Sequence, residues 1–290
     1  MTALKGNTAR DELICRLKDR ARFVRLETVR LTRIAGAGHY TSAFSAAELL
    51  AALYYSQLRV NPAQPGWPDR DRFVLSKGHA AIGLYPILAD LRFFQATDLD
   101  TYTRLGSAFG DHPDMRKIPG IDFSSGSLGH GLSVSLGMAL SARVRGQSYR
   151  TYCMVGDGEL SEGQIWEAAI AAAHYRVGSL VCIVDRNQLS IDGPTERIMA
   201  VEPIEDKFRA FGWETQRIDG HDLNAILDAF SSLHSDSTGV PQIIVADTIK
   251  GRGVRRMELN TDWHVGNLEG ADYDDVVHEL TCGSEEVGVA

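Results

Sequence analysis

Short apolar segments alternate with helical patterns from residue 151 onward, and this alternation restricts the fold more than any other feature of the sequence. Segments of strand length lie at 151–155, 179–185, 213–219 and 241–249, and all except 213–219 are mostly apolar. The segments between them carry apolar residues at the spacing of an amphipathic helix. Apolar strands separated by helices of about 10–15 residues are typical of a parallel sheet with helices on its faces. The sequence therefore predicts an α/β fold with a doubly wound, mostly parallel sheet and helices on both faces.

The first half of the chain is predicted to be mainly helical. The spacing of apolar residues predicts helices over 11–34, 45–58, 77–94 and 127–146, and one short strand over 72–76. Ser45 is followed three residues later by Glu48, a capping-box pattern that predicts a helix start at Ser45, after a break over 35–44. We expect residues 1–290 to form a single domain with an N-terminal helical extension. The acidic tail, about residues 271–290, is expected to be loosely held or covered by a partner.

The composition argues against several classes of protein. The 290 residues have a net charge of −8 and no long basic cluster, so a nucleic-acid-binding surface is not expected. No segment approaches the roughly 18 apolar residues of a membrane span, and the charged N-terminal segment lacks the apolar core of a secretory signal. We therefore expect a cytoplasmic protein that does not bind membranes. Cys153 and Cys182 lie inside predicted strands, which favours buried free thiols.

Two polar residues, Asp157 and Asn187, follow closely after two successive predicted strands. In sheets of this kind, ligands bind at the carboxyl ends of the strands. A carboxylate and an amide oxygen suit Mg²⁺ or Ca²⁺, and Mg²⁺ commonly fills its other positions with phosphate oxygens and water. Gly156 and Gly158 let the backbone approach a ligand closely, and the helix that starts near Ser161 presents free N–H groups to an anion. These residues predict a metal-bridged diphosphate site, whereas GDG alone would indicate only a turn.

The GDG sequence, with Asn about thirty residues later, resembles the signature of thiamine-diphosphate enzymes. Longer segments resemble the diphosphate-binding half of transketolase, among them DRFVLSKGHAAIGLYPIL, GDHPDMRKIPGIDFSSGSLGHGLSVSLGMAL, GDGELSEGQIWEAA, VDRNQLSIDGPT and DTIKGRGV. They occur in the order of that family over about residues 20–270. The resemblance is strongest to the N-terminal subunits of split transketolases, in which two chains supply the two halves of the enzyme. It implies that residues 1–290 are the diphosphate-binding domain.

The resemblance implies a ligand set for the metal and the cofactor. Asp157 and Asn187 would bind Mg²⁺ or Ca²⁺ through their side chains, and Leu189 would bind it through its backbone carbonyl. Leu128 and Ile191 would pack against thiamine diphosphate and hold its two rings in the bent form. The implied cofactor-binding residues are His79, Gly126, Leu128, Gly156, Gly158, Glu159, Asn187, Ile191 and His264.

The resemblance also implies catalytic roles for His39, His79, His112, Glu162 and His264. His39 and His112 match histidines that line the substrate channel, although AGAGHY departs from the GHPG sequence common in the family. The alternative for each histidine is an ordinary surface or hydrogen-bonding residue. Glu162 is in the first turn of a predicted helix, where the helix dipole favours an acid. By resemblance it also lies at the subunit interface, facing the glutamate that activates the cofactor.

By the same resemblance, that activating glutamate belongs to a second domain, which we expect to come from another chain. After the strand at 241–249 only about forty residues remain, too few for another doubly wound sheet. The resemblance therefore implies a partner, the C-terminal transketolase subunit with the pyrimidine-binding domain, in an α2β2 heterotetramer. The expected enzyme is a transketolase-like transferase of carbohydrate metabolism, active only in that assembly. It would move a two-carbon ketol unit from a ketose to an aldose.

Several alternatives remain at this point. The chain could be a subunit of another thiamine-diphosphate enzyme, such as an acyloin or ketol synthase or a 2-oxoacid dehydrogenase component. A non-catalytic scaffold subunit is a further possibility, but the presence of Asp157, Asn187, His79 and His112 together argues against it. A Rossmann dehydrogenase fits less well, since the glycines of LGHGLSVSLG lack a suitable acidic strand end. The donor, the acceptor, their phosphorylation and the identity of the divalent metal stay open.

Overall fold

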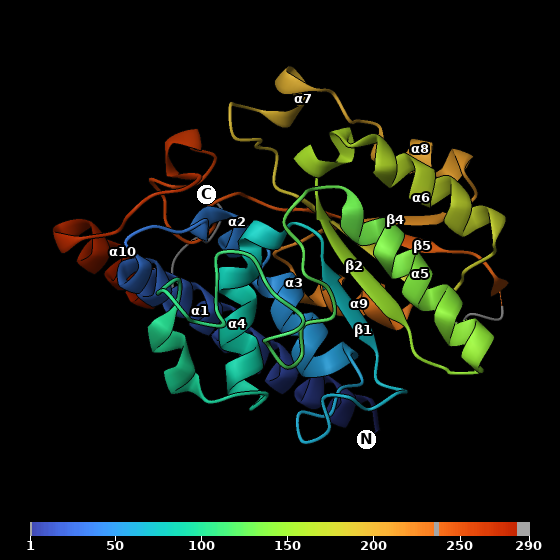
Figure 1. The fold of residues 1–290 in the computed structure, drawn as a ribbon, viewed down its shortest axis with the longest axis horizontal. Helices are drawn as coiled ribbons and strands as arrows, with labels where there is room; N and C mark the ends of the chain where they lie inside the picture. The colour runs from blue at the N-terminus through green and yellow to red at the C-terminus, as the bar shows by residue number, and fades with distance from the viewer. Residues whose placement is uncertain (1, 235–237, 283–290) are drawn as a thin grey trace.

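The computed structural model describes residues 2–234 and 238–282 and is built around one five-stranded sheet (Figure 1). Every neighbouring pair of strands is parallel, and the spatial order is β1-β2-β3-β5-β4. The strands are β1 (Arg72–Leu75), β2 (Thr151–Gly156), β3 (Leu180–Arg186), β4 (Glu214–Asp219) and β5 (Gln242–Asp247). The predicted α/β fold with a parallel sheet is confirmed, and each of the five predicted strands is present.

Side chains alternate between the two faces of the sheet, as the geometry of a strand requires. In β2, Tyr152 and Met154 belong to one buried hydrophobic cluster, whereas Cys153 and Val155 belong to the other. All four of these side chains are almost completely buried. Burial of β2, β3 and β5 on both faces explains why these strands appear in the sequence as continuous apolar runs rather than as alternating ones, whereas the edge strand β4 is partly exposed.

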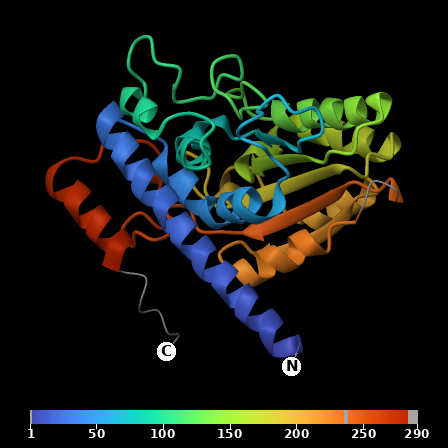
Figure 2. The ribbon, with the colours of Figure 1, turned by 90° about the horizontal axis from the view of Figure 1, so that it is seen from below.

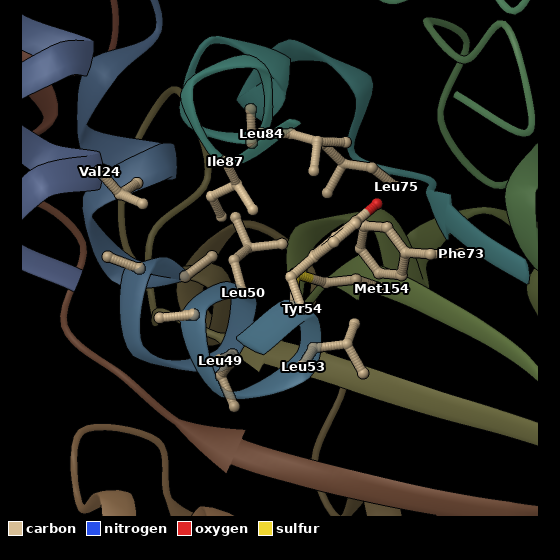
Figure 3. Packing of buried hydrophobic residues seen from close by; sticks show 14 of the residues in the cluster. Val24, Leu49, Leu50, Leu53, Tyr54, Phe73, Leu75, Leu84, Ile87 and Met154 are labelled. Carbon is tan, nitrogen blue, oxygen red and sulfur yellow. The ribbon is translucent and has the colours of Figure 1, made fainter. Parts of the chain in front are cut away.

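Helices cover both faces of the sheet. One face packs against α3 (Ala47–Ala52), α4 (Ala81–Asp90) and α9 (Leu223–Ser231). Figure 3 shows part of this cluster, where Leu50, Ile87 and Met154 come from α3, α4 and β2. The other face packs against α5 (His130–Arg145), α6 (Gly163–His174) and α8 (Ile204–Ala210). Among the described residues, no helix has the length and apolar character needed to cross a membrane.

The remaining helices extend the first face and form the connections. The long helix α1 (Thr2–Ala35) packs on α3 and α4 and runs along the outside of the molecule (Figure 2). The short helical segments are α2 (Tyr40–Ser45), the π-helical turn η1 (Leu53–Gln57), η2 (Gly78–Ala80), η3 (Ala96–Thr101), η4 (Gly158–Ser161), α7 (Thr195–Ile198) and η6 (Thr261–Trp263). Residues 102–129 contain no helix or strand, so the helix predicted over 127–146 begins only at His130.

The predicted helix start at Ser45 is wrong. Ser45 is the last residue of α2, and Ala46 precedes α3 without any side-chain cap hydrogen bond. The Ser45 hydroxyl instead donates to Asp185 at 2.7 Å, and Glu48 pairs with Arg25 at 2.6 Å. Both polar groups of the apparent capping box therefore make tertiary contacts. The predicted break over 35–44 is also partly wrong, because its second half forms the buried helix α2.

The expectation of a loosely held acidic tail is wrong for its first part. Residues Gly270–Cys282 form helix α10, which packs against α1 (Figure 2). Val276 and Leu280 are buried in a cluster with Val29 of α1. The acidic residues occupy the outer side of this amphipathic helix, which explains why the tail looks hydrophilic in the sequence. Residues 283–290 lie outside the described residues.

Candidate functional site

A cavity of about 360 Å³ lies at the carboxyl edge of the parallel sheet. Its floor is formed by residues that follow the strands: Lys77 after β1, Asp157 after β2, Asn187 after β3 and Lys250 after β5. Because β2 and β3 pair in parallel, with Gly156 opposite Asp185, the residues beyond them meet at the same edge. The volume falls within the range of about 300–1,000 Å³ that is usual for small-molecule sites.

The cavity gathers nearly all the residues that the sequence singled out. Its lining includes the predicted metal ligands and every predicted cofactor-binding residue, namely His79, Gly126, Leu128, Gly156, Asp157, Gly158, Glu159, Asn187, Leu189, Ile191 and His264. The predicted catalytic residues His39 and His112 also line it. Glu162 does not: it is the exposed N-cap residue of α6 and makes no side-chain cap hydrogen bond. The roles of all these residues stay predictions.

Asp157 is the central carboxylate of the cavity floor and is only 2% exposed. It accepts hydrogen bonds from the backbone N–H groups of Gln188 and Gly158, at 2.8 and 2.9 Å, and from the Thr195 hydroxyl at 3.1 Å. Burial and the nearby negative charge of Asp185 raise the pKa of Asp157. A buried carboxylate in this environment is stabilised by a cation.

The donor groups around Asp157 fit a hard divalent metal. Asn187 Oδ1 accepts from the backbone N–H of Leu189 at 3.2 Å, so both residues are held in one tight turn. The Leu189 carbonyl faces the cavity floor, where it accepts from the Lys250 ammonium at 3.1 Å. A carboxylate, an amide oxygen and a backbone carbonyl are the ligand types that Mg²⁺ and Ca²⁺ prefer. The sequence-based choice of Asp157, Asn187 and Leu189 is therefore chemically consistent.

Glu159 anchors the glycine turn to the opposite wall. Its buried carboxylate accepts from the Ser76 hydroxyl and from the backbone N–H groups of Gly129 and Gly156, at 2.8 and 3.0 Å. Burial raises the pKa of Glu159. The side chain thus binds the chain after β1, the start of α5 and the end of β2 together, and holds the backbone around Gly158 next to the cavity.

Lys77 and Asp185 form a buried ion pair beneath the cavity that sequence reasoning missed. Their side chains are 1% and 0% exposed. Lys77 also donates to the Ser42 carbonyl at 3.0 Å, and Asp185 accepts from the hydroxyls of Ser45 and Thr248. Burial opposes ionisation of Asp185, but Lys77 and these donors outweigh it and lower its pKa. The pair connects α2 to the ends of β1, β3 and β5.

Lys250, the second missed residue, has no carboxylate partner among the described residues. Its ammonium lies 2.7 Å from Nδ1 of His264. Burial and the charge of Lys77 lower the pKa of Lys250 to about 8, and burial and Lys250 lower that of His264 to about 4. His264 is therefore neutral near pH 7, with Nδ1 accepting from the ammonium. Lys250 supplies the cavity with a positive charge that could face an anion.

The four predicted histidines form one cluster. The ring of His39 lies 5.4 Å from that of His79, 5.3 Å from that of His264 and 6.5 Å from that of His112, between centroids. Burial and the charge of Lys77 lower the pKa of His79 well below its usual range. His39 is 3.0 Å from the Asp111 carboxylate. The cluster thus combines two neutral rings, His79 and His264, with two rings that lie near the Asp111 carboxylate, His39 and His112.

A backbone bridge closes the cluster. Gly38 and Gly266 pair in antiparallel fashion, with N–H···O distances of 3.0 and 3.3 Å. This bridge brings His39, which precedes α2, next to His264, which follows η6.

A signal for the two missed lysines was present in the sequence, because both follow predicted strands within three residues, as Asp157 and Asn187 do.

Comparison with known proteins places this site in a family. Residues 17–286 match the family model described as transketolase, thiamine diphosphate binding domain. The chain belongs to the transketolase family. The predicted resemblance is therefore confirmed, and with it the thiamine-diphosphate-binding domain.

Other members of the transketolase family are similar over most of the chain. A 6-deoxy-6-sulfo-D-fructose transketolase subunit of Clostridium sp. (strain MSTE9) is 44% identical over 82% of this chain and 86% of its own length. An apulose-4-phosphate transketolase subunit of Phocaeicola vulgatus is 39% identical, over 89% of this chain and 91% of its own.

Solved transketolases have the same fold over this part of their sequence. The transketolase from Leishmania mexicana superposes with a TM-score of 0.84 and 26% identity, covering 91% of this chain and 41% of that one. The Pichia stipitis transketolase in complex with sedoheptulose-7-phosphate gives 0.83 and 28%, covering 91% and 40%. The chain therefore spans about two fifths of the length of these transketolases.

Proposed function

We propose that this chain is the diphosphate-binding subunit of a two-subunit transketolase that moves a two-carbon ketol unit from a ketose to an aldose. The observation that carries the proposal is the composition of one cavity. Oxygen donors from Asp157, Asn187 and Leu189 share it with two lysines and four histidines. A metal with a diphosphate needs the oxygens and the positive charge, and a sugar substrate needs groups that exchange protons with hydroxyls.

Each part of the cavity has a task in this proposal. Asp157, Asn187 and the Leu189 carbonyl would hold Mg²⁺ or Ca²⁺. Gly156 leaves room for the diphosphate, since a Cβ there would have no neighbour closer than 4.0 Å, whereas a Cβ on Gly158 would lie 3.0 Å from Ser190 Oγ. Thiamine diphosphate, when bound, supplies the electron sink for breaking the carbon–carbon bond. His39 and His112 would contact the substrate at the mouth of the cavity.

The partner in this proposal is a C-terminal transketolase subunit, and the assembly is an α2β2 heterotetramer. Support comes from the two similar proteins, both of which are named as subunits of transketolases and are matched over 86% and 91% of their own length. Ile191 lines the cavity and is nevertheless 64% exposed, as expected if another surface completes the site. Glu162, exposed on α6, would lie at that interface. Location in the cytoplasm is part of the proposal.

The names of the similar proteins suggest which ketose donors to assay first. Their names specify a sulfonated ketose and a ketose phosphate, so the donor proposed here is a ketose with an anionic terminal group. The acceptor is an aldose. Among the described residues that line the cavity, there is no arginine to bind such an anionic group. The proposal therefore assigns that contact to the partner chain.

Mixing experiments test the proposal. The purified chain is assayed for ketol transfer alone, with its candidate partner, and with both chains plus thiamine diphosphate and Mg²⁺. We expect transfer only in the complete mixture, with loss of activity on addition of a chelator. Full activity of this chain alone, or no transfer from any tested ketose in a complex that forms stably, would contradict the proposal.

A further inference from the structure

The loop that leads to His112 carries a carboxylate, Asp111, whose presence the proposed function does not explain. Asp111 Oδ2 lies 3.0 Å from Nδ1 of His39, and 3.7 Å from Nδ1 of His112. The side chains of Asp111 and His39 are 34% and 22% exposed, so water reaches the pair only in part. Burial acts to raise the pKa of Asp111, but the hydrogen bonds from His39 and Tyr102 and the electrostatic effects of His39 and His112 together outweigh it and lower that pKa.

Both partners of this contact are held by the fold. Tyr102 donates to Asp111 Oδ1 at 3.4 Å, and Tyr85 donates to the carbonyl of the preceding residue, Gly110, at 2.9 Å. Both tyrosine rings are completely buried. On the other side, the backbone bridge at Gly38 fixes the residue before His39. The contact is therefore built into the structure and does not depend on two freely moving surface side chains.

The carboxylate determines which ring nitrogen of His39 carries the proton. An ionised carboxylate only accepts hydrogen bonds, so Nδ1 of His39 must be the donor. In the neutral ring, Nε2 is then the acceptor. Within 2–234 and 238–282, no hydrogen bond engages Nε2. The ring lies beside His79 and His264, which line the same cavity.

His39 differs from its neighbour His264 in which ring nitrogen carries the proton. On His264, Nδ1 faces the ammonium of Lys250 at 2.7 Å, so that nitrogen is the acceptor. On His39, the same nitrogen faces a carboxylate. The two rings are 5.3 Å apart and nearly perpendicular, yet they are held in opposite tautomers. His39 is thus the ring of this pair that can accept a proton through Nε2.

We propose that Asp111 is a positioning residue that fixes the tautomer and orientation of His39 for proton transfer to and from the sugar substrate. The inference rests on the proposed ketol transfer. In the cleavage direction, the O–H bond of a sugar hydroxyl breaks and an N–H bond forms at Nε2. The O–H electron pair becomes part of the aldehyde C=O of the departing aldose, and the carbon–carbon electron pair stays with the two-carbon fragment. In the reverse direction the proton returns to the aldehyde oxygen.

A tautomer measurement tests the inference without relying on activity. The full chain is labelled with ¹⁵N-histidine, and the His39 signals are assigned by their loss in His39→Gln. Long-range ¹H–¹⁵N spectra distinguish a protonated from an unprotonated ring nitrogen. We expect the neutral ring of His39 to carry its proton on Nδ1 in the wild type and to lose this preference in Asp111→Ala. A wild-type ring with its proton on Nε2 would overturn the inference.

Kinetics of the assembled enzyme supply the second test. We expect Asp111→Asn to lower kcat by about 10- to 100-fold, the range typical for a partner that orients a functional histidine. The KM values and the affinity for thiamine diphosphate should change little. Asp111→Glu, which keeps the acceptor, should recover part of the loss. The matched control is Asp114→Asn, since Asp114 is in the same loop but pairs with Arg116 rather than a histidine.

The two tests separate failure of this inference from failure of the proposed function. If the wild-type complex forms but transfers no ketol unit, the proposed function fails, while the spectra still report the tautomer. If the wild type is active and Asp111→Asn has the same kcat, the positioning role is refuted. It is equally refuted if Asp114→Asn reduces kcat as much as Asp111→Asn does.

Discussion

The backbone amide of Gly131 donates to Ser76 Oγ at 3.1 Å, which places the first turn of α5 directly against the end of β1. A Cβ atom on Gly131 would overlap Ser76 Oγ and lie 2.8 Å from Ser76 Cα. Ser76 also donates to Glu159, the carboxylate that holds the glycine turn. Packing of one helix against one strand end is therefore coupled to the shape of the cavity.

Gly131→Ala is expected to destabilise the protein by about 1–3 kcal/mol, the usual cost of overpacking a tight contact. Gly137→Ala, six residues later in α5, is the matched control. Gly137 is exposed and a Cβ there would meet nothing within 4 Å, so alanine should stabilise the helix by about 0.5–1 kcal/mol. Urea unfolding measures both. Equal effects of the two substitutions would contradict the assigned contact.

Lys77→Met should destabilise the chain by about 3–5 kcal/mol, because it leaves the Asp185 carboxylate buried without its cation. Replacing both residues, with Lys77→Met and Asp185→Leu, should recover a large part of that loss. The control is Lys117→Met at an exposed site, where the change should stay within about 0.5 kcal/mol. Urea unfolding midpoints decide between these expectations; a Lys77→Met chain as stable as the wild type would show that the buried pair is not formed.

Asp157→Ala should abolish metal-dependent binding of thiamine diphosphate in the assembled enzyme, since Asp157 is the one carboxylate of the predicted ligand set. Titration calorimetry with cofactor and Mg²⁺ measures this. Asp219→Ala serves as the control, because Asp219 also ends a strand but does not line the cavity. An unchanged affinity in the Asp157 variant would disprove the metal assignment.

The buried histidine His264 should make the protein less stable in mild acid. Its pKa is lowered from 6.5 to about 4, by burial and by Lys250. Below about pH 6.5 the unfolded chain binds a proton at this position, but the folded chain does so only near pH 4. The free energy of unfolding therefore falls as the pH is lowered through this window.

His264→Gln tests this assignment because glutamine cannot take up the proton. Relative to the wild type, the variant should gain stability as the pH falls from about 7 to about 5. Urea unfolding at several pH values gives the difference. His174→Gln, at the exposed end of α6, is the control, and its free energy of unfolding should change with pH as that of the wild type does. A His264→Gln curve that is also parallel would mean that His264 protonates normally in the folded chain.

The fold could be predicted because its central strands β2, β3 and β5 are buried on both faces. Cys153, Val155 and their neighbours form continuous apolar runs of strand length, and the helices between them have a clear period. The helix start at Ser45 could not be predicted from the local pattern. The Ser45 hydroxyl donates to Asp185, which is far away in the sequence, and this hydrogen bond takes the place of the predicted helix cap. Helix α10 was missed because its acidic outer side dominates the composition.

The site residues that stand in a recognisable motif could be predicted from the sequence, and most of the others could not. Asp157 and Asn187 stand in motifs at strand ends, and the structure brings them to one cavity. Lys77 and Lys250 were missed because a lysine is usually exposed, and burial is visible only in three dimensions. The pairing of Asp111 with His39 joins the loop after η3 to the segment before α2, and no local pattern encodes such a contact.

Because Gly38 pairs with Gly266, the ribosome must make nearly all of the described chain before the histidine cluster can form. Strands β1 to β3, with Asp157 and Asn187 at their ends, leave the ribosome much earlier. A nascent chain can therefore begin to fold its sheet before His264, which must pack beside His39, has been synthesised. A polypeptide that terminates just after β5 would keep the predicted metal ligands and lack the ring that faces Lys250.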